Sequence, residues 1–502
     1  MSSPSVAVIV PSVVSHNLDV HTGIPFMPHM AAHLVSSISK AKLPVQVLDS
    51  FGISSNTIEV HGKFMLMGLP ADQIVGRVNH DTDIVFIYCR TIEDLLSTEI
   101  IGKEFRKLRP DIKVVLFENI QTVNSFSLKE IIPEFLRTFA DVGIMGEPEL
   151  RAVELINALR SGIPALQTID GIAYMEANKE VIFTHPEAFN TSLDDLEFPG
   201  WELFDLSGYW SAGFAHPPIK KDSKFLPILT SRGCPYRCTF CVSPAINPKW
   251  RSRSAKNVVD EIEYFQKLLG VSDFHVSDLD PTISDSRTRG IAEEIIARGL
   301  KISWKIAQGT KIETVKSTET LTLLRKSGCV FFSFSPETGS EHMLEIMNKK
   351  FDKDHALRLT RHMNKIGIRT QACFIAGVPG ERLKDRLQTL AYMSKLVFAG
   401  VDEIAVTIFT PIPGAALSES LSGYSHYSEL SHSPKWREDY FQVSAFRYSM
   451  YLLFFFLKLK YPRKVAREIR GILSKNFETK MEMSIYKFFR IRWLYLNNSK
   501  RY

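Results

Sequence analysis

The sequence predicts an α/β protein in three parts: an N-terminal doubly wound (flavodoxin/Rossmann-like) domain, a partial (β/α)6 barrel and a mainly helical C-terminal region. Short apolar runs alternate with helical patterns over residues 1–160, and the alternation resumes over residues 225–410. Strands separated by helices form parallel sheets that helices cover on both faces. After residue 420 the alternation stops, and aromatic and basic residues become frequent.

Composition and boundaries are consistent with several globular domains. The 502 residues are 45% hydrophobic and 23% charged. We expect a doubly wound domain over 1–160, a linker with a hairpin over 161–222, the barrel over 223–420 and the C-terminal region over 421–502. Six cysteines are too few for a secreted disulfide scaffold, and the N-terminus does not look like a secretory signal. No apolar run reaches 18 residues, so we expect no membrane span. The sparse cysteines predict a reducing interior, and we therefore expect a cytoplasmic protein.

The first domain has the pattern of a five-stranded parallel sheet. Its strands are expected at Val6–Val10, Val45–Leu48, Ile84–Tyr88, Val114–Phe117 and Val142–Ile144. Its helices are expected at His29–Lys40, Ser97–Leu108 and Glu149–Leu159. Such sheets bind ligands at the carboxyl ends of their strands. In the linker, Ile172–Met175 and Glu180–Phe183 predict the hairpin.

The second series of strands and helices amounts to three quarters of a (β/α)8 barrel. Its strands are expected at Phe225–Thr230, Asp273–Ser277, Ile302–Ala307, Cys329–Ser335, Thr370–Ala376 and Glu403–Phe409. Its helices are expected at Ala255–Leu269, Thr288–Ala297, Ser317–Lys326, Glu341–Met347, Lys353–Ile366 and Arg382–Phe398. Active sites of such barrels lie at the carboxyl ends of the strands.

Three cysteines lie close together after the first barrel strand, at the predicted barrel mouth. Cys234, Cys238 and Cys241 are within eight residues. Thiolates are the usual ligands of iron–sulfur clusters, and three of them leave one iron of a cubane open. An amino acid could bind that iron through its amine and carboxylate. The neighbouring Arg232 and Arg237 are expected to favour the thiolate forms.

The alternative for these cysteines is a structural zinc site. Zinc usually takes four Cys or His ligands, commonly as two close pairs. The sequence has no second cysteine pair, and the next histidine along the chain, His275, falls in a predicted strand. Cys89, Cys329 and Cys373 lie in apolar strands, where we expect small core residues.

The Cys-x3-Cys-x2-Cys spacing, with the aromatic Phe240 before the last cysteine, resembles the radical S-adenosylmethionine (SAM) superfamily. The resemblance implies a 4Fe-4S cluster on Cys234, Cys238 and Cys241, with SAM on the open iron. It implies reductive cleavage of SAM to methionine and a 5′-deoxyadenosyl radical, with Phe240 near the adenine. An electron donor such as flavodoxin or ferredoxin would supply the electron.

Five further residues lie in segments that match this superfamily over residues 225–415. Ser335 and Glu337 are expected to hydrogen-bond the ribose or amino group of SAM, and Gly377 to allow close approach of adenine or methionine. Asp278, with Asp280, is expected to line the barrel mouth. Taken singly, each match has an ordinary structural explanation, as a turn glycine or a helix cap.

The N-terminal domain resembles that of the radical SAM subgroup which binds cobalamin. The resemblance rests on residues 23–34, on Gly146-Glu147 and on the Phe198-Pro199-Gly200-Trp201 segment. Two features depart from it. Phe117-Glu118-Asn119 stands where the subgroup commonly has a glycine pair, and His21 is a poor candidate for a cobalt ligand. The alternative is a retained scaffold with an altered pocket.

The C-terminal region is strongly basic. Residues 431–502 hold 16 Lys and Arg against 5 Asp and Glu. We weigh a helical subdomain with a solvated basic face against a peripheral membrane contact, while a nucleic acid partner is not expected. A membrane-facing region would suit a hydrophobic small-molecule substrate.

The residues and the resemblance together predict a radical SAM enzyme. The leading hypothesis is cobalamin-dependent methylation of an unactivated carbon. The second is a cyclase, isomerase or dehydrogenase that transfers no methyl group. The third is not an enzyme but an iron–sulfur sensor or interaction protein on the same scaffold.

Overall fold

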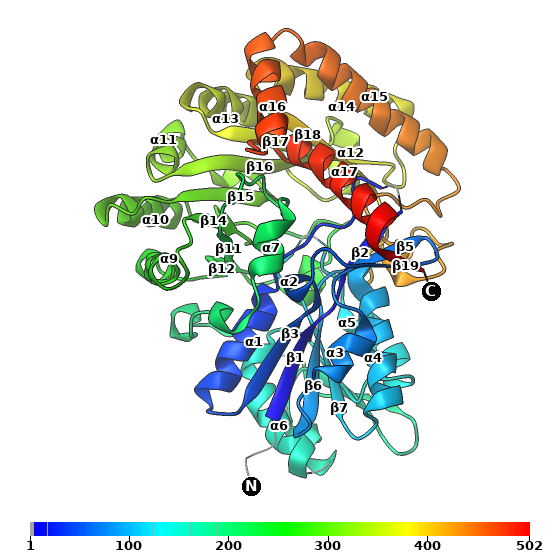
Figure 1. Ribbon diagram of the computed structural model, residues 1–502. Helices are drawn as coiled ribbons and strands as arrows, with labels where there is room; N and C mark the ends of the chain where they lie inside the picture. The colour runs from blue at the N-terminus through cyan, green and yellow to red at the C-terminus, as the bar shows by residue number, and fades with distance from the viewer. Residues whose placement is uncertain (1–4, 18, 123, 162, 187, 502) are drawn as a thin grey trace.

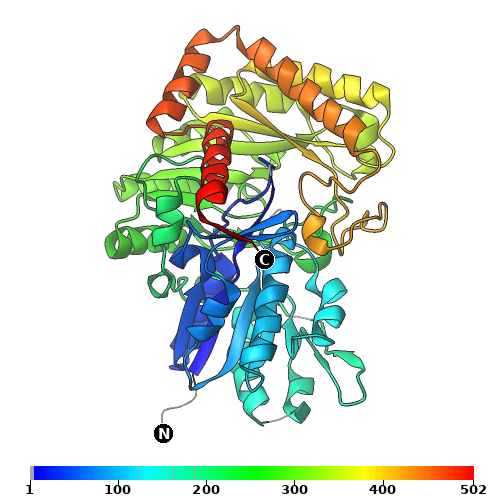
Figure 2. The same ribbon diagram turned by 45° about the vertical axis from the view of Figure 1, so that its right-hand side comes forward.

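The structure is a computed structural model that describes residues 5–17, 19–122, 124–161, 163–186 and 188–501. Figure 1 shows the N-terminal sheet and its helices in the lower half of the molecule, with the barrel sheet above them. The last three helices cross the upper part of the molecule and return toward the N-terminal domain. Figure 2 shows the same arrangement turned by 45°.

The N-terminal sheet has the strand order β10-β9-β8-β7-β6-β1-β3, in which β3, β1, β6, β7 and β8 are parallel. This order confirms the expected doubly wound, flavodoxin-like fold. The parallel strands are β1 (Ser5–Val10), β3 (Val45–Asp49), β6 (Thr82–Cys89), β7 (Lys113–Glu118) and β8 (Val142–Ile144). The helices are α1 (His29–Lys40), α2 (Ser50–Ile53), α3 (Ala71–Gly76), α4 (Leu95–Leu108), α5 (Leu128–Leu136) and α6 (Ala152–Ser161).

The predicted hairpin belongs to this sheet. Strands β9 (Ile172–Met175) and β10 (Val181–Phe183) pair antiparallel, and β9 pairs antiparallel with β8. Because Ile172 and Ala173 are fully buried, the hairpin extends the core of the first domain and is not a free linker. After it come α7 (Ser207–Ala212) and the barrel.

A small second sheet had no clear sequence signal. Its strands β2 (Val13–His16), β4 (Ile58–His61) and β5 (Phe64–Met67) have four residues each, too few for a recognisable alternation. Strand β19 (Ser499–Arg501), from the far end of the chain, pairs with β4. The helix α5 was also missed, because Pro133 lies inside it.

The barrel sheet is open and six-stranded, with parallel strands in the order β11-β14-β15-β16-β17-β18. All six expected strands are confirmed: β11 (Phe225–Ile228), β14 (Asp273–Val276), β15 (Ser303–Thr310), β16 (Cys329–Glu337), β17 (Arg369–Ala376) and β18 (Glu403–Ile408). The helices are α8 (Ser243–Ile246), α9 (Ala255–Leu269), α10 (Asp285–Ala297), α11 (Thr318–Lys326), α12 (Glu341–Ile346), α13 (Lys353–Ile366) and α14 (Leu383–Ala399). A short two-stranded ladder, β12 (Ser231–Arg232) with β13 (Arg251–Ser252), follows β11.

Local capping explains why the helix ends were predictable. The Ser254 side chain accepts the Asn257 N–H at the start of α9, and the Asp352 side chain accepts the His355 N–H at the start of α13. Gly270 and Gly367 end these helices in the left-handed conformation.

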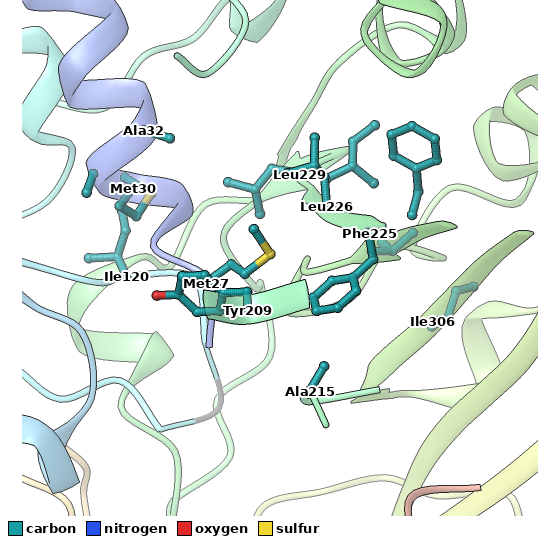
Figure 3. Close-up of a cluster of buried hydrophobic side chains, with 14 of the residues drawn as sticks. Met27, Met30, Ala32, Ile120, Tyr209, Ala215, Phe225, Leu226, Leu229 and Ile306 are labelled. Carbon is teal, nitrogen blue, oxygen red and sulfur yellow. The ribbon is translucent and has the colours of Figure 1, made fainter. Parts of the chain in front are cut away.

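The two domains share one continuous hydrophobic core. Figure 3 shows Met27, Met30 and Ile120 of the N-terminal domain in the same buried cluster as Phe225 and Leu226 of β11. Their burial removes apolar surface of both domains from water, which favours a single rigid arrangement.

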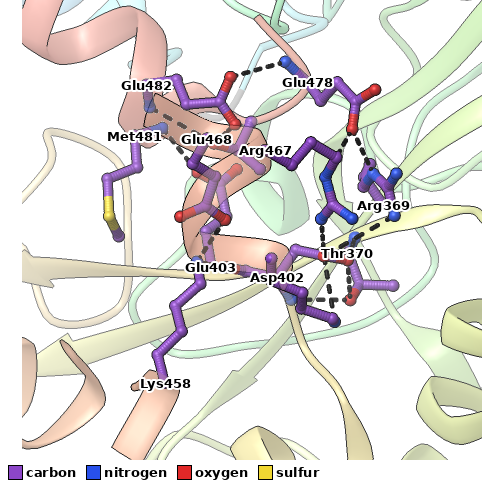
Figure 4. A network of polar contacts seen from close by, with 12 residues as sticks. Arg369, Thr370, Asp402, Glu403, Lys458, Arg467, Glu468, Glu478, Met481 and Glu482 are labelled. Atoms are coloured by element: carbon purple, nitrogen blue, oxygen red, sulfur yellow. Dashed lines mark hydrogen bonds and ion pairs between the residues drawn. The ribbon is translucent and has the colours of Figure 1, made fainter. Parts of the chain in front are cut away.

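The C-terminal region is helical, as expected, with α15 (Tyr440–Lys458), α16 (Pro462–Ser474) and α17 (Lys480–Asn498). A polar network fixes these helices to the barrel edge (Figure 4). Lys464 and Arg467 both lie 3.1 Å from the fully buried Asp402, just before β18. Glu403 accepts the backbone N–H groups of Lys480 and Met481. Among the described residues, no helix is long and apolar enough to cross a membrane.

Candidate active site

A cavity of about 750 Å³ lies between the N-terminal domain, the barrel and the C-terminal helices. Glu93 and Asn124, which follow β6 and β7, line it from the first domain. Ser335 and Glu337, near the carboxyl end of β16, line it from the barrel. The carboxyl ends of both parallel sheets therefore face one space, where each of these folds binds its ligands.

The cysteine loop reaches the edge of this cavity through Phe240. At Gly233 the backbone has a φ of +80°, and a β-carbon would lie 2.1 Å from the Lys249 carbonyl oxygen, so glycine is required. The Cys234 N–H donates to the Asn247 carbonyl at 3.1 Å, and the Thr239 N–H to the Met347 carbonyl at 3.1 Å. The loop is thus held at both ends.

The three thiols of this loop are free and half-buried. Burial raises the pKa of Cys234 to about 12 and that of Cys238 to about 11. At Cys238 the positive charges of Lys349 and Lys311 oppose the effect of burial. Since metals bind the thiolate, cluster assembly must release these protons. Neither lysine was singled out from the sequence, because both are distant from the cysteines along the chain.

The donor set fits a cluster with an open iron. Three thiols come from one loop, and within the described ranges no group of three or more His, Cys, Asp or Glu side chains is spaced for a single metal ion. A four-iron cluster is wider than one ion, so its ligands need not meet that spacing.

Two of the residues predicted to bind SAM line the same cavity as Phe240. Ser335 and Glu337 are both largely buried. Glu337 has a φ of +64°, which is uncommon for a residue with a side chain and is often found at functional sites. Its carboxylate pairs with the Lys349 ammonium at 2.6 Å.

Asp278 and Gly377 lie elsewhere. Asp278 is fully buried and does not line the cavity, contrary to the expected place at the mouth. Its carboxylate accepts hydrogen bonds from the backbone and hydroxyl of Thr230 and from the Ser231 hydroxyl, so it positions the chain that leads to the cysteines. At Gly377, a β-carbon would lie 2.7 Å from Val443 of α15, so that side of the glycine is occupied by protein.

The cavity also has a polar floor that the sequence did not indicate. Lys480 of α17 donates to the Ala307 carbonyl at 2.9 Å and lies 3.1 Å from His216 Nε2. Cys373, expected in the core, lines the cavity next to this floor and contacts Ser333. Cys89 and Cys329 are fully buried, as expected. His21 also lines the cavity.

The predicted Gly146-Glu147 turn joins the two domains. The fully buried Arg232 pairs with Glu147 at 3.0 Å and with Glu149, and Arg251 pairs with Glu147 at 2.8 Å. The expectation that Arg232 favours the thiolates is therefore wrong, because two carboxylates from the other domain compensate its charge.

The loop after β7 carries buried polar groups. Side-chain atoms of Gln121, Thr122 and Asn124 are buried without a hydrogen-bond partner among the described residues. Unsatisfied buried groups are costly, so their presence here favours a polar ligand. The preceding Glu118 accepts the N–H groups of Gly146 and Leu128, both at 2.8 Å.

The family model of the radical SAM superfamily matches residues 228–393, from the last residue of β11 into α14. This span contains the cysteine loop, Ser335, Glu337 and Gly377. The chain contains a radical SAM domain. Its radical SAM barrel is thus the half of the molecule that carries the three thiols.

Two curated relatives of this radical SAM protein have different described activities. An uncharacterized methyltransferase of Pyrococcus horikoshii is 27% identical over 299 residues, which are 59% of this chain and 61% of the relative. The anaerobic magnesium-protoporphyrin IX monomethyl ester cyclase of Cereibacter sphaeroides is 26% identical over 440 residues, 81% of this chain and 65% of the relative. The chain spans less than two thirds of the length of these relatives.

Two solved radical SAM structures share the fold. The methyltransferase TsrM of Kitasatospora setae, solved with cobalamin and a [4Fe-4S] cluster bound, has a TM-score of 0.64 and 18% identity over 83% of this chain and 74% of its own. The cobalamin-dependent enzyme OxsB has a TM-score of 0.58 and 18% identity over 89% of this chain and 56% of its own.

Proposed function

We propose that this protein is a radical SAM enzyme that methylates an unactivated carbon of a small molecule with the help of cobalamin. The observation that carries the proposal is the position of the three-cysteine loop. It lies at the edge of a large cavity onto which the carboxyl ends of both sheets open. A cluster held by one domain and a cofactor held by the other would both adjoin that cavity.

Cys234, Cys238 and Cys241 would hold the 4Fe-4S cluster and leave one iron for SAM. When bound, these cofactors supply one-electron cleavage of SAM to methionine and a 5′-deoxyadenosyl radical, with cobalamin as the methyl carrier. The Lys349 and Lys311 charges near Cys238 favour the thiolate that a cluster requires.

The side chains around the cavity would bind and orient SAM. Phe240 offers an aromatic face to the adenine, while the Ser335 hydroxyl and the Glu337 carboxylate are placed to hydrogen-bond the ribose or amino group. Asp278 would act indirectly, because its carboxylate holds Thr230, which leads into the cysteine loop. A contact from Gly377 to SAM remains a prediction.

Cobalamin at the N-terminal domain is supported by two observations. TsrM was solved with cobalamin bound, and OxsB is described as cobalamin-dependent. The unpaired polar atoms of Gln121, Thr122 and Asn124 lie at the carboxyl edge of the sheet, where a ligand rich in amides would pair with them.

A cyclase is the second candidate. The match to the magnesium-protoporphyrin ester cyclase covers 81% of this chain, against 59% for the Pyrococcus horikoshii methyltransferase. SAM with a labelled methyl group separates the two: label in the product supports methylation. A product without label supports a cyclase, isomerase or dehydrogenase.

Anaerobic reconstitution with iron, sulfide and hydroxocobalamin tests the proposal. We expect about four irons and one cobalt per chain, and 5′-deoxyadenosine when SAM and reduced flavodoxin, as electron donor, are added. Cys241→Ser should lose the cluster and form no 5′-deoxyadenosine, while Cys329→Ala, away from the cavity, should keep both.

Three results would contradict the proposal in different ways. Failure of the intact chain to assemble a cluster would overturn it entirely. A cluster that never cleaves SAM would favour an iron–sulfur sensor. Cleavage without bound cobalt would leave a radical SAM enzyme that does not use cobalamin.

A further inference from the structure

The helix α15 exposes a continuous apolar stripe. Phe441, Tyr448, Leu452 and Phe456, with Leu459 directly after the helix, recur at helical spacing and are all exposed, with Leu452 at 71%. Soluble proteins rarely expose contiguous apolar patches of this extent without a binding partner.

The helix α17 exposes a second stripe of the same kind. Ile485, Phe489, Trp493 and Leu496 are exposed at spacings of three and four residues. Both ribbon views show α16 connecting α15 and α17 in the upper part of the molecule (Figures 1 and 2), and side chains of α15 and α17 line the same cavity. The exposed stripes of α15 and α17 are called the apolar face below.

The cavity opens through this face. Tyr448, Leu452 and Phe455 of α15 and Ile485 and Phe489 of α17 line the cavity and are also exposed to solvent. A molecule that enters here passes between apolar side chains and reaches the polar floor around Lys480.

The exposed charge of the three C-terminal helices is basic. Over residues 440–497, the described charged residues that are exposed are Lys460, Arg463, Arg470, Lys475 and Arg492. One exposed acidic residue, Glu438, lies just before α15. The acidic residues of the same segment are less exposed and paired within the protein. Glu468 pairs with Lys458, Glu478 with Arg369 and Arg467, and the buried Glu482 accepts from Thr479.

We propose that the apolar face docks on an anionic lipid bilayer, and that the cavity takes its substrate, an apolar amphiphile, from that bilayer. Exposed apolar side chains flanked by basic ones are the combination that binds anionic membrane surfaces. A symmetric pair of chains would instead bring the same basic residues together, which disfavours self-association through this face. The substrate half of the inference rests on the proposed function, whereas the docking half does not.

The docking is tested by sedimentation of the full chain with phosphatidylcholine vesicles that contain or lack phosphatidylglycerol. We expect binding to the anionic vesicles, and roughly tenfold weaker binding for Phe456→Ser/Leu459→Ser/Trp493→Ser. These three side chains are exposed but do not line the cavity. The control is Leu108→Ser/Leu268→Ser/Ile296→Ser, three exposed apolar side chains on α4, α9 and α10.

The docking half is overturned if the intact chain does not bind anionic vesicles, or if the control variant loses as much vesicle binding as the face variant. It is also overturned if light scattering shows a dimer that only the face variant disrupts. Cluster content and 5′-deoxyadenosine formation of the face variant should equal those of the unaltered chain. If neither the face variant nor the unaltered chain held a cluster or formed 5′-deoxyadenosine, the proposed function would be contradicted, but the docking would not.

The substrate half is tested with cis-parinaric acid, a fluorescent amphiphile. Its emission should rise with the unaltered chain and with the face variant, because both keep the cavity. Leu452→Asp/Phe489→Asp places charges at the cavity mouth and should weaken binding at least fivefold. No rise with the unaltered chain, or equal binding by the charged variant, would overturn this half.

Discussion

At the scale of single residues, the cavity is lined by ionisable groups whose pKa values are shifted by burial. Glu93 is largely buried where the first domain meets the cavity, and burial raises its pKa to about 8. His21, on the same side, has its pKa lowered to about 3 by burial and by Arg447. Both shifts favour the neutral forms of these two side chains near neutral pH.

Glu93 makes stability depend on pH. Between its ordinary pKa of 4.5 and about 8, the folded protein keeps a proton on Glu93 that the unfolded chain releases. The free energy of unfolding therefore falls as the pH rises through this window. Glutamine cannot ionise, so we expect Glu93→Gln to equal the unaltered chain near pH 4.5 and to exceed it by up to a few kcal/mol near pH 9.

Thermal unfolding of both proteins at pH 5, 7 and 9 measures this difference. The gap in unfolding temperature should widen steadily with pH. A gap that stays constant, or that narrows as the pH rises, would show that Glu93 is ionised in the folded protein.

At the scale of elements, the cysteine loop depends on its backbone as much as on its thiols. Gly233 and Gly270 both have positive φ, +80° and +68°. Only Gly233 has no room for a β-carbon, since nothing lies within 4 Å of the corresponding position at Gly270. These two glycines therefore separate the conformational effect of glycine from the steric one.

We expect Gly233→Ala to bind less than half the iron of the unaltered chain after anaerobic reconstitution. Its β-carbon would displace the Lys249 carbonyl and with it the start of the loop. Gly270→Ala carries only the backbone cost of about 1 kcal/mol and should bind iron normally. Equal iron in the two variants would mean that the loop tolerates the displacement.

At the scale of the whole molecule, a buried ion cluster joins the two domains beside the cysteine loop. Arg232 of the barrel is enclosed by Glu147 and Glu149 of the N-terminal domain. Removing one member of a buried ion pair leaves an uncompensated charge and typically costs about 3–5 kcal/mol. The cluster therefore ties the position of the cysteine loop to the first domain.

Arg232→Met should lower the unfolding temperature and speed proteolysis within the linker region, residues 161–222. Lys40→Met is the control, because Lys40 pairs with Glu197 at 2.6 Å while both side chains are more than half exposed. The control should change stability by less than about 1 kcal/mol. A second change, Glu149→Leu, should restore part of the loss in Arg232→Met. Similar effects from Arg232→Met and Lys40→Met would refute the joining role.

The sequence by itself predicted those features that depend on residues close together in the chain. The strands of both parallel sheets were predictable because they are short apolar runs between helical patterns, and α9 and α13 because their caps are local. The cysteine spacing identified the superfamily, since a loop that binds a cluster must place three thiols within a few residues. Phe240, Ser335 and Glu337, placed by that resemblance, do line the cavity.

Only the tertiary structure decided what depends on residues far apart in the chain. It placed Lys349 and Lys311 near Cys238, and Cys373 and His21 in the lining of the cavity. Asp278 accepts a hydrogen bond from Thr230, and Arg232 forms an ion pair with Glu149 of the other domain. The tertiary structure also paired β19 with β4 and set α15 and α17 around the cavity mouth. The physical reason is that local periodicity and spacing are set by adjacent residues, whereas burial and charge pairing arise only when distant segments pack together.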